Sequence, residues 1–367
     1  AEEALRAARA LNVTLGDRAG HAAIDNEIGL LAEERGDHRG ALDAFRRALQ
    51  AWRDAGDQHG AAEALNNIGF ASFLLGQYGD AEVYWQQARD AYARLGDQNG
   101  RVRTMQNLAL LAIARGQWDV ARRLLDEALV QARQMQMVEE LAVTRRNFAD
   151  LELQQGHLGR SIEHARAAEE AFRGRDDNRG VTDAVLLQAE ATLEQGNAPA
   201  ARTLLQGIGA LLRDASTEQQ AIGAFLQARI AHAAGDAAQR ERELQRARLL
   251  ASSSGVRALQ LRIDLLAAQG RRAPITALDA PTAALGHVPL RLEWLAAAMR
   301  EALARGDARA AMAHYDEALR RLRGGDVLHA EALHRLGADA RRAGGDDVGA
   351  RAALARAEEA AKARRER

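Results

Sequence analysis

Residues 64–78 read ALNNIGFASFLLGQY, and this pattern returns at a fixed interval along the chain. Residues 104–118 read TMQNLALLAIARGQW, and residues 144–158 read TRRNFADLELQQGHL. One asparagine therefore recurs every forty residues, at Asn67, Asn107 and Asn147. The turn glycines keep the same interval: Gly36, Gly76, Gly116, Gly156 and Gly196. A period of this length is the sequence signature of a protein built from stacked structural repeats.

Each repeat predicts two antiparallel helices. An apolar-periodic helix ends at the turn glycine, which adopts the left-handed conformation without steric cost. A second helix follows at once, as in GDHRGALDAFRRALQAWRDAGD at residues 36–57. Small residues at repeating positions let the helices approach, and bulky residues fill the space between successive hairpins. Because neither helix buries its apolar face alone, the hairpins must stack.

The stretch NNIGFASFLLGQYGDAEVYWQQA at residues 66–88 resembles the tetratricopeptide repeat in its Gly/Ala, Gly-aromatic and terminal Ala positions. The usual unit is about 34 residues long. The forty-residue form is similar to the repeats of kinesin light chain, of Pins-type scaffolds, and of bacterial regulators and kinases that carry such arrays. This resemblance implies an all-α protein, a right-handed α-solenoid superhelix of about nine helical hairpins.

The period also predicts the organisation of the chain. We expect an N-terminal half-repeat helix in residues 1–20, five regular repeats in 21–220, shorter divergent repeats in 221–270, and C-terminal repeats with a capping helix in 290–367. Residues 271–289 contain three of the four prolines, so the outer helix there should be short or broken. We hypothesise a bend at that segment.

Composition excludes several classes of function. The chain has 367 residues, with 50 basic and 51 acidic side chains, so its net charge carries no nucleic-acid footprint. The absence of cysteine excludes disulfides and thiolate metal sites. No apolar run is long enough for a membrane span, and no signal peptide is apparent. We therefore expect a cytoplasmic protein, with arginine-rich composition indicating a bacterial source, and a fragment of a longer chain because it begins without methionine.

No pattern in the sequence predicts catalysis, a metal or a cofactor. The histidine pairs His157 with His164 and His329 with His334 lack the spacing of a zinc helix, so we interpret all four as solvated surface residues. The paired carboxylates at 176–177 and 346–347 fall in loops, where helix capping explains them. We expect a protein that is not an enzyme.

The resemblance implies where a partner would bind. In tetratricopeptide arrays the first helix of each hairpin lines the concave groove, and the recurring asparagine faces that groove. Asn67, Asn107 and Asn147 would then form a ladder that bonds the backbone of an extended peptide. The predicted groove neighbours that select the partner are Asn66, Phe70, Arg103, Gln106 and Arg146. They describe an apolar pocket around Phe70, followed by a cationic section, which suits a segment with a hydrophobic anchor beside an acidic group.

Two alternatives stay open for these residues. The asparagines also suit hydrogen bonds to a neighbouring repeat, and Phe70 also suits the core. From the fifth repeat onward the inner positions are predicted to turn apolar, at Leu186, Leu187, Ile222 and Phe225. That stretch would either close by tight winding or accept an amphipathic helix.

The sequence thus favours a non-enzymatic interaction scaffold that binds a protein or peptide segment in its concave groove, as the regulatory part of a bacterial signalling protein. The alternative is a sensor of a small ligand or signal peptide that controls an attached transcription-regulator or kinase domain. Self-association through the apolar C-terminal half is compatible with both. Nucleic acid and membrane are not expected partners of this segment.

Overall fold

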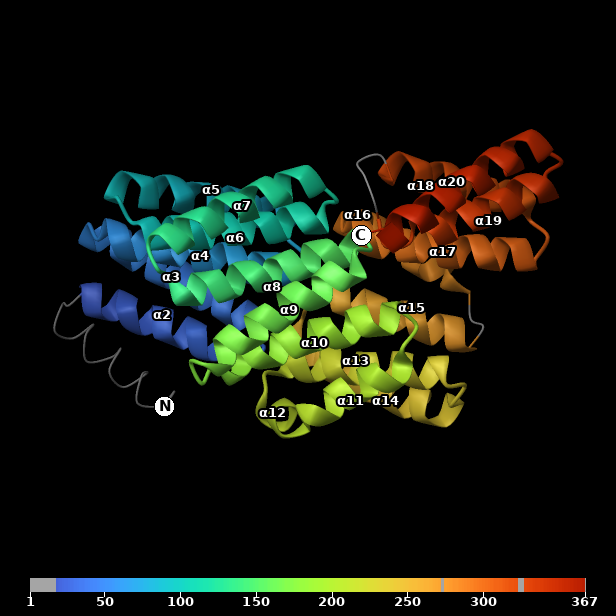
Figure 1. The fold of residues 1–367 in the computed structure, drawn as a ribbon. Helices are drawn as coiled ribbons and strands as arrows, with labels where there is room; N and C mark the ends of the chain where they lie inside the picture. Colours follow the sequence, from blue (N-terminus) through green and yellow to red (C-terminus); the bar gives the residue numbers. More distant parts are fainter. Residues whose placement is uncertain (1–17, 272–273, 323–326, 367) are drawn as a thin grey trace.

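The computed structural model describes residues 18–271, 274–322 and 327–366, and every regular element within them is a helix (Figure 1). These helices form nine consecutive hairpins, each with an inner and an outer arm. The inner helices are α2 (Arg18–Glu34), α4 (Gln58–Leu74), α6 (Gln98–Ala114), α8 (Val138–Gln154), α10 (Asn178–Glu194), α13 (Thr217–Ala233), α15 (Arg257–Arg271), α17 (Val288–Ala304) and α19 (Ala330–Ala343). The predicted half-repeat at 1–20 lies almost entirely outside the described residues.

The outer arms are less uniform than the inner ones. They are α3 (His38–Ala55), α5 (Tyr78–Leu95), α7 (Trp118–Gln134), α9 (Leu158–Arg173), α11 (Ala198–Gly207) with α12 (Gly209–Asp214), α14 (Ala237–Ser254), the 3-10 helix η1 (Ile275–Leu278) with α16 (Asp279–Leu285), α18 (Ala308–Arg321) and α20 (Asp347–Glu366). The short η1 and α16 occupy the proline-containing segment, where a broken outer helix was predicted. The break between α11 and α12 has no proline and was not predicted.

Close packing of the two arms explains the repeated small residue on each inner helix. A Cβ at Gly69 would lie 2.5 Å from Cδ1 of Trp85, so only glycine lets the indole pack against the α4 backbone. The indole Nε1 then donates a hydrogen bond to the carbonyl oxygen of Asn66 at 3.1 Å. Trp85 is fully buried as a result, and it fixes α5 against α4.

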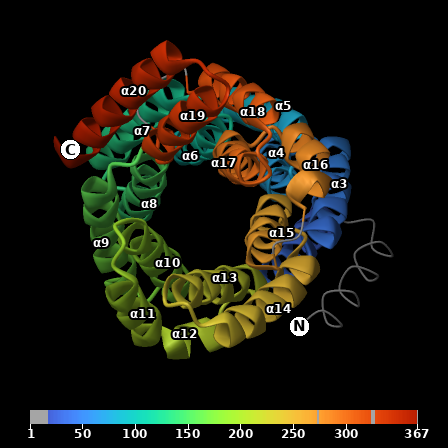
Figure 2. The ribbon, with the colours of Figure 1, turned by 90° about the vertical axis from the view of Figure 1, so that its right-hand side faces the viewer.

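The hairpins wind into a solenoid that makes more than one turn, with the inner arms facing the axis (Figure 2). The turns that end four inner helices each contact the start of the inner arm five hairpins later: Gly36 with Thr217, Gly76 with Arg257, Gly116 with Val288 and Gly156 with Leu328. We call this line of contacts the seam. Hydrogen bonds cross it from Thr217 Oγ1 to the Arg35 carbonyl at 3.0 Å and from the Leu328 amide to the Gln154 carbonyl at 2.9 Å.

This tight winding also fills much of the first half's inner face. On α6, Leu110 and Ile113 belong to one buried cluster with Leu292 and Leu295 of α17. On α4, Leu74 shares another cluster with residues of α13, α14 and α15. The second superhelical turn therefore packs directly on the inner helices of the first, and apolar burial holds the turns together.

Candidate functional site

The asparagine ladder joins neighbouring repeats instead of lining an open groove. Its side-chain amides donate to the residue forty-one positions earlier: Asn67 to Asn26 Oδ1 at 3.1 Å, Asn107 to Asn66 Oδ1 at 2.9 Å, and Asn147 to the Gln106 carbonyl at 3.4 Å. Asn147 is fully buried, whereas the other two donors are half-buried. The prediction of a solvent-facing ladder is thus wrong for Asn147, and the interpretation as a bond between repeats describes all three contacts.

The predicted selecting residues Asn66 and Gln106 are buried as well, which contradicts their placement in the groove. Asn66 accepts from the next repeat, and Gln106 Nε2 donates to the Glu140 carbonyl and to Thr144 Oγ1, both at 2.9 Å. The physical reason is that a buried amide costs free energy unless it is paired, and the adjacent inner helix supplies the partners. These polar residues therefore specify how repeats stack.

The apolar pocket predicted around Phe70 is filled by the protein itself. Phe70 is half-buried and packs against a cluster that includes Val256, Leu259 and Ile263 at or near α15. The arginines of the predicted cationic section, Arg103 and Arg146, are half-buried and do not line the cavities described below. The second superhelical turn thus covers the part of the first-half groove around Phe70, and a space of about 240 Å³ remains beside Phe73 and Leu110.

The histidine interpretation needs a correction too. His157 and His334 are buried, and each has a polar partner: His157 Nδ1 lies 2.6 Å from Glu152 Oε2, and His334 Nδ1 lies 2.8 Å from the Tyr315 hydroxyl. His164 and His329 are half-buried. Among the residues that the structure describes, no group of three histidine or acidic side chains is arranged to hold a metal ion.

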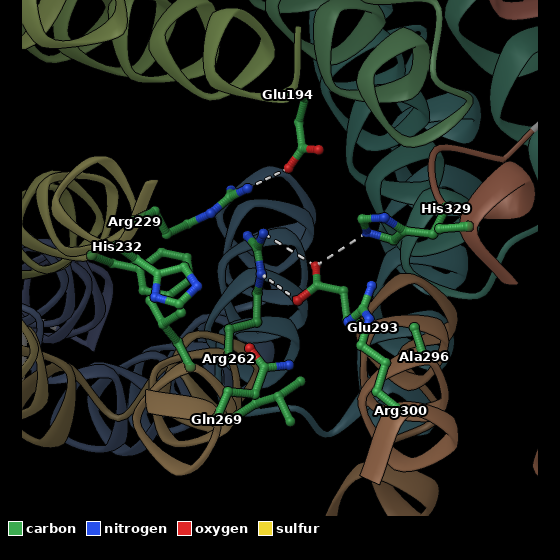
Figure 3. Close-up of a pocket in the computed structure, with 13 residues that line it drawn as sticks. Glu194, Arg229, His232, Arg262, Gln269, Glu293, Ala296, Arg300 and His329 are labelled. Atoms are coloured by element: carbon green, nitrogen blue, oxygen red, sulfur yellow. Dashed lines mark hydrogen bonds and ion pairs between the residues drawn. The ribbon is translucent and has the colours of Figure 1, made fainter. Parts of the chain in front are cut away.

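The open part of the inner face lies in the second half, where five inner helices surround a cavity of about 330 Å³ (Figure 3). We call it the inner cavity. It is lined by Glu194 of α10, Phe225, Arg229 and His232 of α13, Arg262, Leu265, Leu266 and Gln269 of α15, Glu293, Ala296 and Arg300 of α17, His329, and Ala332 of α19. An adjoining space of about 240 Å³ shares Phe225, Arg262 and Glu293 and continues toward α4, α6 and α8.

A chain of ion pairs crosses the inner cavity. Arg262 Nη2 lies 2.7 Å from Glu190 Oε1 and 3.1 Å from Glu293 Oε1, and Arg229 pairs with Glu190 at 3.1 Å and with Glu194. Glu293 also lies 3.9 Å from His329 Nε2. The Arg262 guanidinium stands 5.1 Å from the centre of the Phe225 ring, within the range of a cation–π contact.

These pairs keep their members charged. Burial by itself would lower the pKa of Arg262, but the carboxylates of Glu190 and Glu293 outweigh it and raise that pKa. Burial would raise the pKa of Glu293, but Arg262 and His329 outweigh it and hold the pKa well below its usual range. The carboxylates of the inner cavity are therefore committed to arginines, an arrangement suited to fixing geometry and not to proton transfer.

The sequence contained a signal for part of this site. The residue three positions after each ladder asparagine changes from Leu110 to Asp150, and the corresponding position in the fifth repeat is Glu190. Three residues advance a helix by most of a turn, so these positions face the axis while the asparagines face the preceding inner helix. Arg262 and Glu293 lie beyond residue 220, where the forty-residue register no longer holds, and so could not be aligned.

A comparison with known protein families finds the same repeat that the sequence pattern and the helical hairpins indicate. Residues 20–94 and 60–134 match the family model described as tetratricopeptide repeat. No curated protein matches the sequence. No helix in the described ranges is both long and apolar enough to cross a membrane.

Solved structures of low similarity include two Rap proteins. One is a Rap protein complexed with competence and sporulation factor (14% identity, covering 95% of this chain and 76% of that chain, TM-score 0.46). Another is the Rap conjugation gene regulator of plasmid pLS20 in complex with the Phr* peptide (14% identity, 95% and 76% coverage, TM-score 0.44). A human IFIT1 dimer with PPP-AAAA also matches (12% identity, 93% and 91% coverage, TM-score 0.39).

The family match and the stacked helical hairpins lead to the same assignment. The matched residues cover the first three hairpins, and the same inner and outer arms continue through the rest of the described chain. Residues 20–134 match the tetratricopeptide repeat family, and the rest of the described chain continues the same fold of stacked helical hairpins.

Proposed function

We propose that this protein is a non-enzymatic scaffold that binds a short peptide segment in the inner cavity, as the regulatory part of a bacterial signalling protein in the cytoplasm. The observation that carries the proposal is the combination of polar and apolar walls in one cavity formed by five successive inner helices. Ligand sites are typically concave, with a few fixed polar groups among apolar side chains.

The size of the cavity favours a short segment over a folded domain. Its volume of about 330 Å³ lies at the lower end of the range for ligand pockets. Leu265, Leu266 and Phe225 supply apolar wall, while the paired arginines and glutamates hold the helices at fixed separation. Such a wall needs little reorganisation on binding, which reduces the entropic cost of association.

A second candidate is a sensor that reports ligand binding to an attached effector domain. Glu218 favours it, because this residue lines the space adjoining the inner cavity and also lies 4.0 Å from His38 Nε2 across the seam. A ligand that contacts one superhelical turn in this space would thereby bias the contact between turns. The distance across the seam, measured with and without bound peptide, distinguishes a sensor from a passive scaffold. A sensor changes this distance on binding, and a passive scaffold does not.

The binding experiment uses a random heptapeptide library displayed with free C-termini and selected on the immobilised protein. Gln269→Trp fills the inner cavity from an exposed position, and Gln87→Trp places the same side chain on the outer helix α5 as a control. The proposal expects peptides enriched on the wild type to bind the Gln87 variant equally and to lose binding to the Gln269 variant. Equal binding to both variants, or no enrichment on the wild type, would contradict it.

A further inference from the structure

The adjoining space beside the inner cavity is bounded by both superhelical turns. Its volume is about 240 Å³, and its lining side chains come from α4, α6, α8 and α10 of the first turn and from α13, α15 and α17 of the second. The space is therefore complete only when the two turns are closed on each other. It is smaller than the pockets that take drug-sized ligands, so a ligand that fills it must be small.

Negative charge predominates on the wall of the adjoining space. Among the described residues that line it, the carboxylates are Asp150, Glu190, Glu218 and Glu293, and the only arginine is Arg262. Arg262 is already paired with Glu190 and Glu293. His287 adds no positive charge, because burial and Arg262 lower its pKa to about 4 and leave it neutral at neutral pH. Asp150 and Glu218 are thus left without a cation on this wall.

The other neighbours of Asp150 and Glu218 do not neutralise them. Asp150 Oδ1 accepts a hydrogen bond from Gln154 Nε2 at 3.1 Å, and this amide is neutral. Glu218 Oε2 lies 4.0 Å from His38 Nε2, but burial and Arg179 lower the pKa of His38 to about 4. Within the described part of the chain, neither carboxylate is in ion-pair contact with an arginine or a lysine. Two half-buried carboxylates of the same space therefore have no counter-ion.

The protonation of these two carboxyl groups agrees with the count of charges. Burial raises the pKa of both groups, and it raises the pKa of Glu218 to about 7. Arg146 opposes this effect at both groups but does not outweigh burial. The folded chain thus disfavours the ionised form of each carboxyl group, and a cation bound between them would favour it again.

The rest of the wall indicates that this cation is organic. Leu110, Ile113, Ile222 and Leu259 supply aliphatic wall, and Phe73 and Phe225 supply aromatic wall. Aromatic rings attract ammonium ions. No group of three acidic or histidine side chains in the described ranges is arranged to hold a metal ion. A primary alkylammonium ion combines one positive charge, three N–H donors and an apolar body, and so matches this wall.

We infer that the adjoining space is a binding site for a small primary amine, whose ammonium group pairs with Asp150 and Glu218 while its alkyl body packs against Leu110, Ile113 and Ile222. This site is distinct from the peptide site proposed for the inner cavity, and the inference does not rest on that proposal. Because the wall belongs to both superhelical turns, the bound amine holds the two turns together.

The test measures calorimetric affinities of butyl-, hexyl- and octylammonium ions for the protein. The alcohol and the carboxylate with the same alkyl chain as the tightest of the three serve as neutral and anionic analogues. Each ligand is also titrated into Asp150→Asn, which preserves the shape of the side chain, and into Asp126→Asn, which makes the same change at an exposed position of the outer helix α7. Thermal unfolding of the variants monitors folding.

The tightest ammonium ion should bind the wild type at least about 10-fold more tightly than either analogue. Asp150→Asn should remove most of this preference, and Asp126→Asn should leave it unchanged. Equal affinity of the wild type for the ammonium ion and the alcohol would show that the space selects only for apolar groups, and would overturn the inference. The inference would also be wrong if none of the three ammonium ions bound at millimolar concentration.

Proton release provides a second readout, which a purely structural role of these carboxylates would not produce. Titrations at neutral pH in buffers of different ionisation enthalpy report the protons released on binding. Because the pKa of Glu218 is raised to about 7, the ammonium ion should displace a proton from this group, and the alcohol should not. Glu218→Gln should abolish the release, and Glu163→Gln, at an exposed position of α9, should retain it. Binding of the amine without proton release would exclude contact with Glu218 and overturn the assignment.

Discussion

The inner faces of α4 and α6 and those of α13, α15 and α17 occupy equivalent places in the repeat, yet they differ in what covers them. In the first half, Phe70 and Leu110 pack against the second superhelical turn. In the second half, Arg229, Arg262 and Glu293 surround a cavity of about 330 Å³. In a tightly wound solenoid, the second superhelical turn therefore determines which part of the concave face is available to a partner.

The largest expected effect is on the filled half. Phe73 stacks against Tyr78 with ring centroids 5.3 Å apart and contacts Trp85 at 5.7 Å. Phe73→Ala should lower the free energy of unfolding by about 3 kcal/mol, because the half-buried ring packs against clusters from both superhelical turns and its loss widens the adjoining space of about 240 Å³. Chemical denaturation measures the change.

The open half should respond differently to substitution at its inner face. Arg300→Gln changes an exposed side chain in the wall of the inner cavity, so the free energy of unfolding should stay within about 0.5 kcal/mol of the wild type. If Arg300→Gln lowered the free energy of unfolding as much as Phe73→Ala does, the two inner faces would contribute equally to stability. The proposed difference between the two halves would then be wrong.

The seam should weaken as pH rises. Burial, together with the nearby Asp183 and Glu33, raises the pKa of Glu218 to about 7 despite the opposing effect of Arg179. A carboxyl group with a raised pKa stabilises the folded state fully below its unfolded value near 4.5, and this contribution is lost as pH rises through 7. Relative to Glu218→Gln, we expect the wild type to lose about 3 kcal/mol across that window.

The measurement is the unfolding free energy between pH 4.5 and 8 for the wild type and for Glu218→Gln, and the difference between the two profiles gives the contribution of Glu218. The other charged or titratable groups at this contact are His38, Arg146, Arg179, Asp183 and Glu33. Burial and Arg179 lower the pKa of His38 from 6.5 to about 4, so between these values His38 makes the folded state more stable as pH rises and opposes Glu218. Both proteins share this contribution of His38, and it cancels in the difference between their profiles. Identical profiles for the two proteins would exclude Glu218 as the source.

Two turn glycines allow the effect of crowding at the seam to be measured separately from backbone strain. Gly96 and Gly116 both have φ of +70°, but a Cβ at Gly116 would lie 2.9 Å from Val288 Cγ1, whereas nothing lies within 4 Å of one at Gly96. Both alanine variants carry the same conformational cost, and Gly116→Ala adds crowding against a stiff β-branched residue. Gly116→Ala should be less stable than Gly96→Ala by about 1 to 2 kcal/mol. Equal losses would mean that the turns do not touch in solution.

The smallest expected effect is a gain in stability. Gln136 adopts φ of +55° at the position where two earlier repeats have Gly56 and Gly96. Replacing it by glycine relieves a left-handed backbone, and Gln136→Gly should raise the free energy of unfolding by about 1 kcal/mol. Asp176 has φ of +57° in the next repeat, but aspartate tolerates this conformation better, so Asp176→Gly should gain less. Denaturant midpoints of the two variants provide the test.

The sequence predicted the fold well because the repeat is local. The forty-residue register and the turn glycines identify the hairpins, and the prolines near residue 280 identify the broken outer helix. The division of the chain into units with a bend at residues 271–289 stays a prediction. What a local pattern does not contain is the pitch of the superhelix, which depends on small rotations summed over many hairpins.

The site was predicted less well for the same reason. Asn66 and Asn67 pair with opposite neighbours, one accepting from Asn107 and the other donating to Asn26, so their polarity serves stacking. The register placed Asn107 and Asn147 on inner helices, but it did not indicate that Asn147 is buried against the preceding inner helix. Arg262 pairs with Glu190 and Glu293, which lie many positions away in the sequence, and no periodicity indicates these contacts.

The closure of the superhelix in solution is the central claim, and the absence of cysteine makes it directly measurable. Nitroxide labels on Gln77→Cys and Arg257→Cys would flank the seam at exposed positions, since a Cβ at the adjacent Gly76 lies 3.3 Å from Arg257 Cβ. A closed superhelix should give strong dipolar broadening of the electron paramagnetic resonance spectrum relative to the sum of the two singly labelled proteins. A spectrum equal to that sum would show that the superhelix is open in solution.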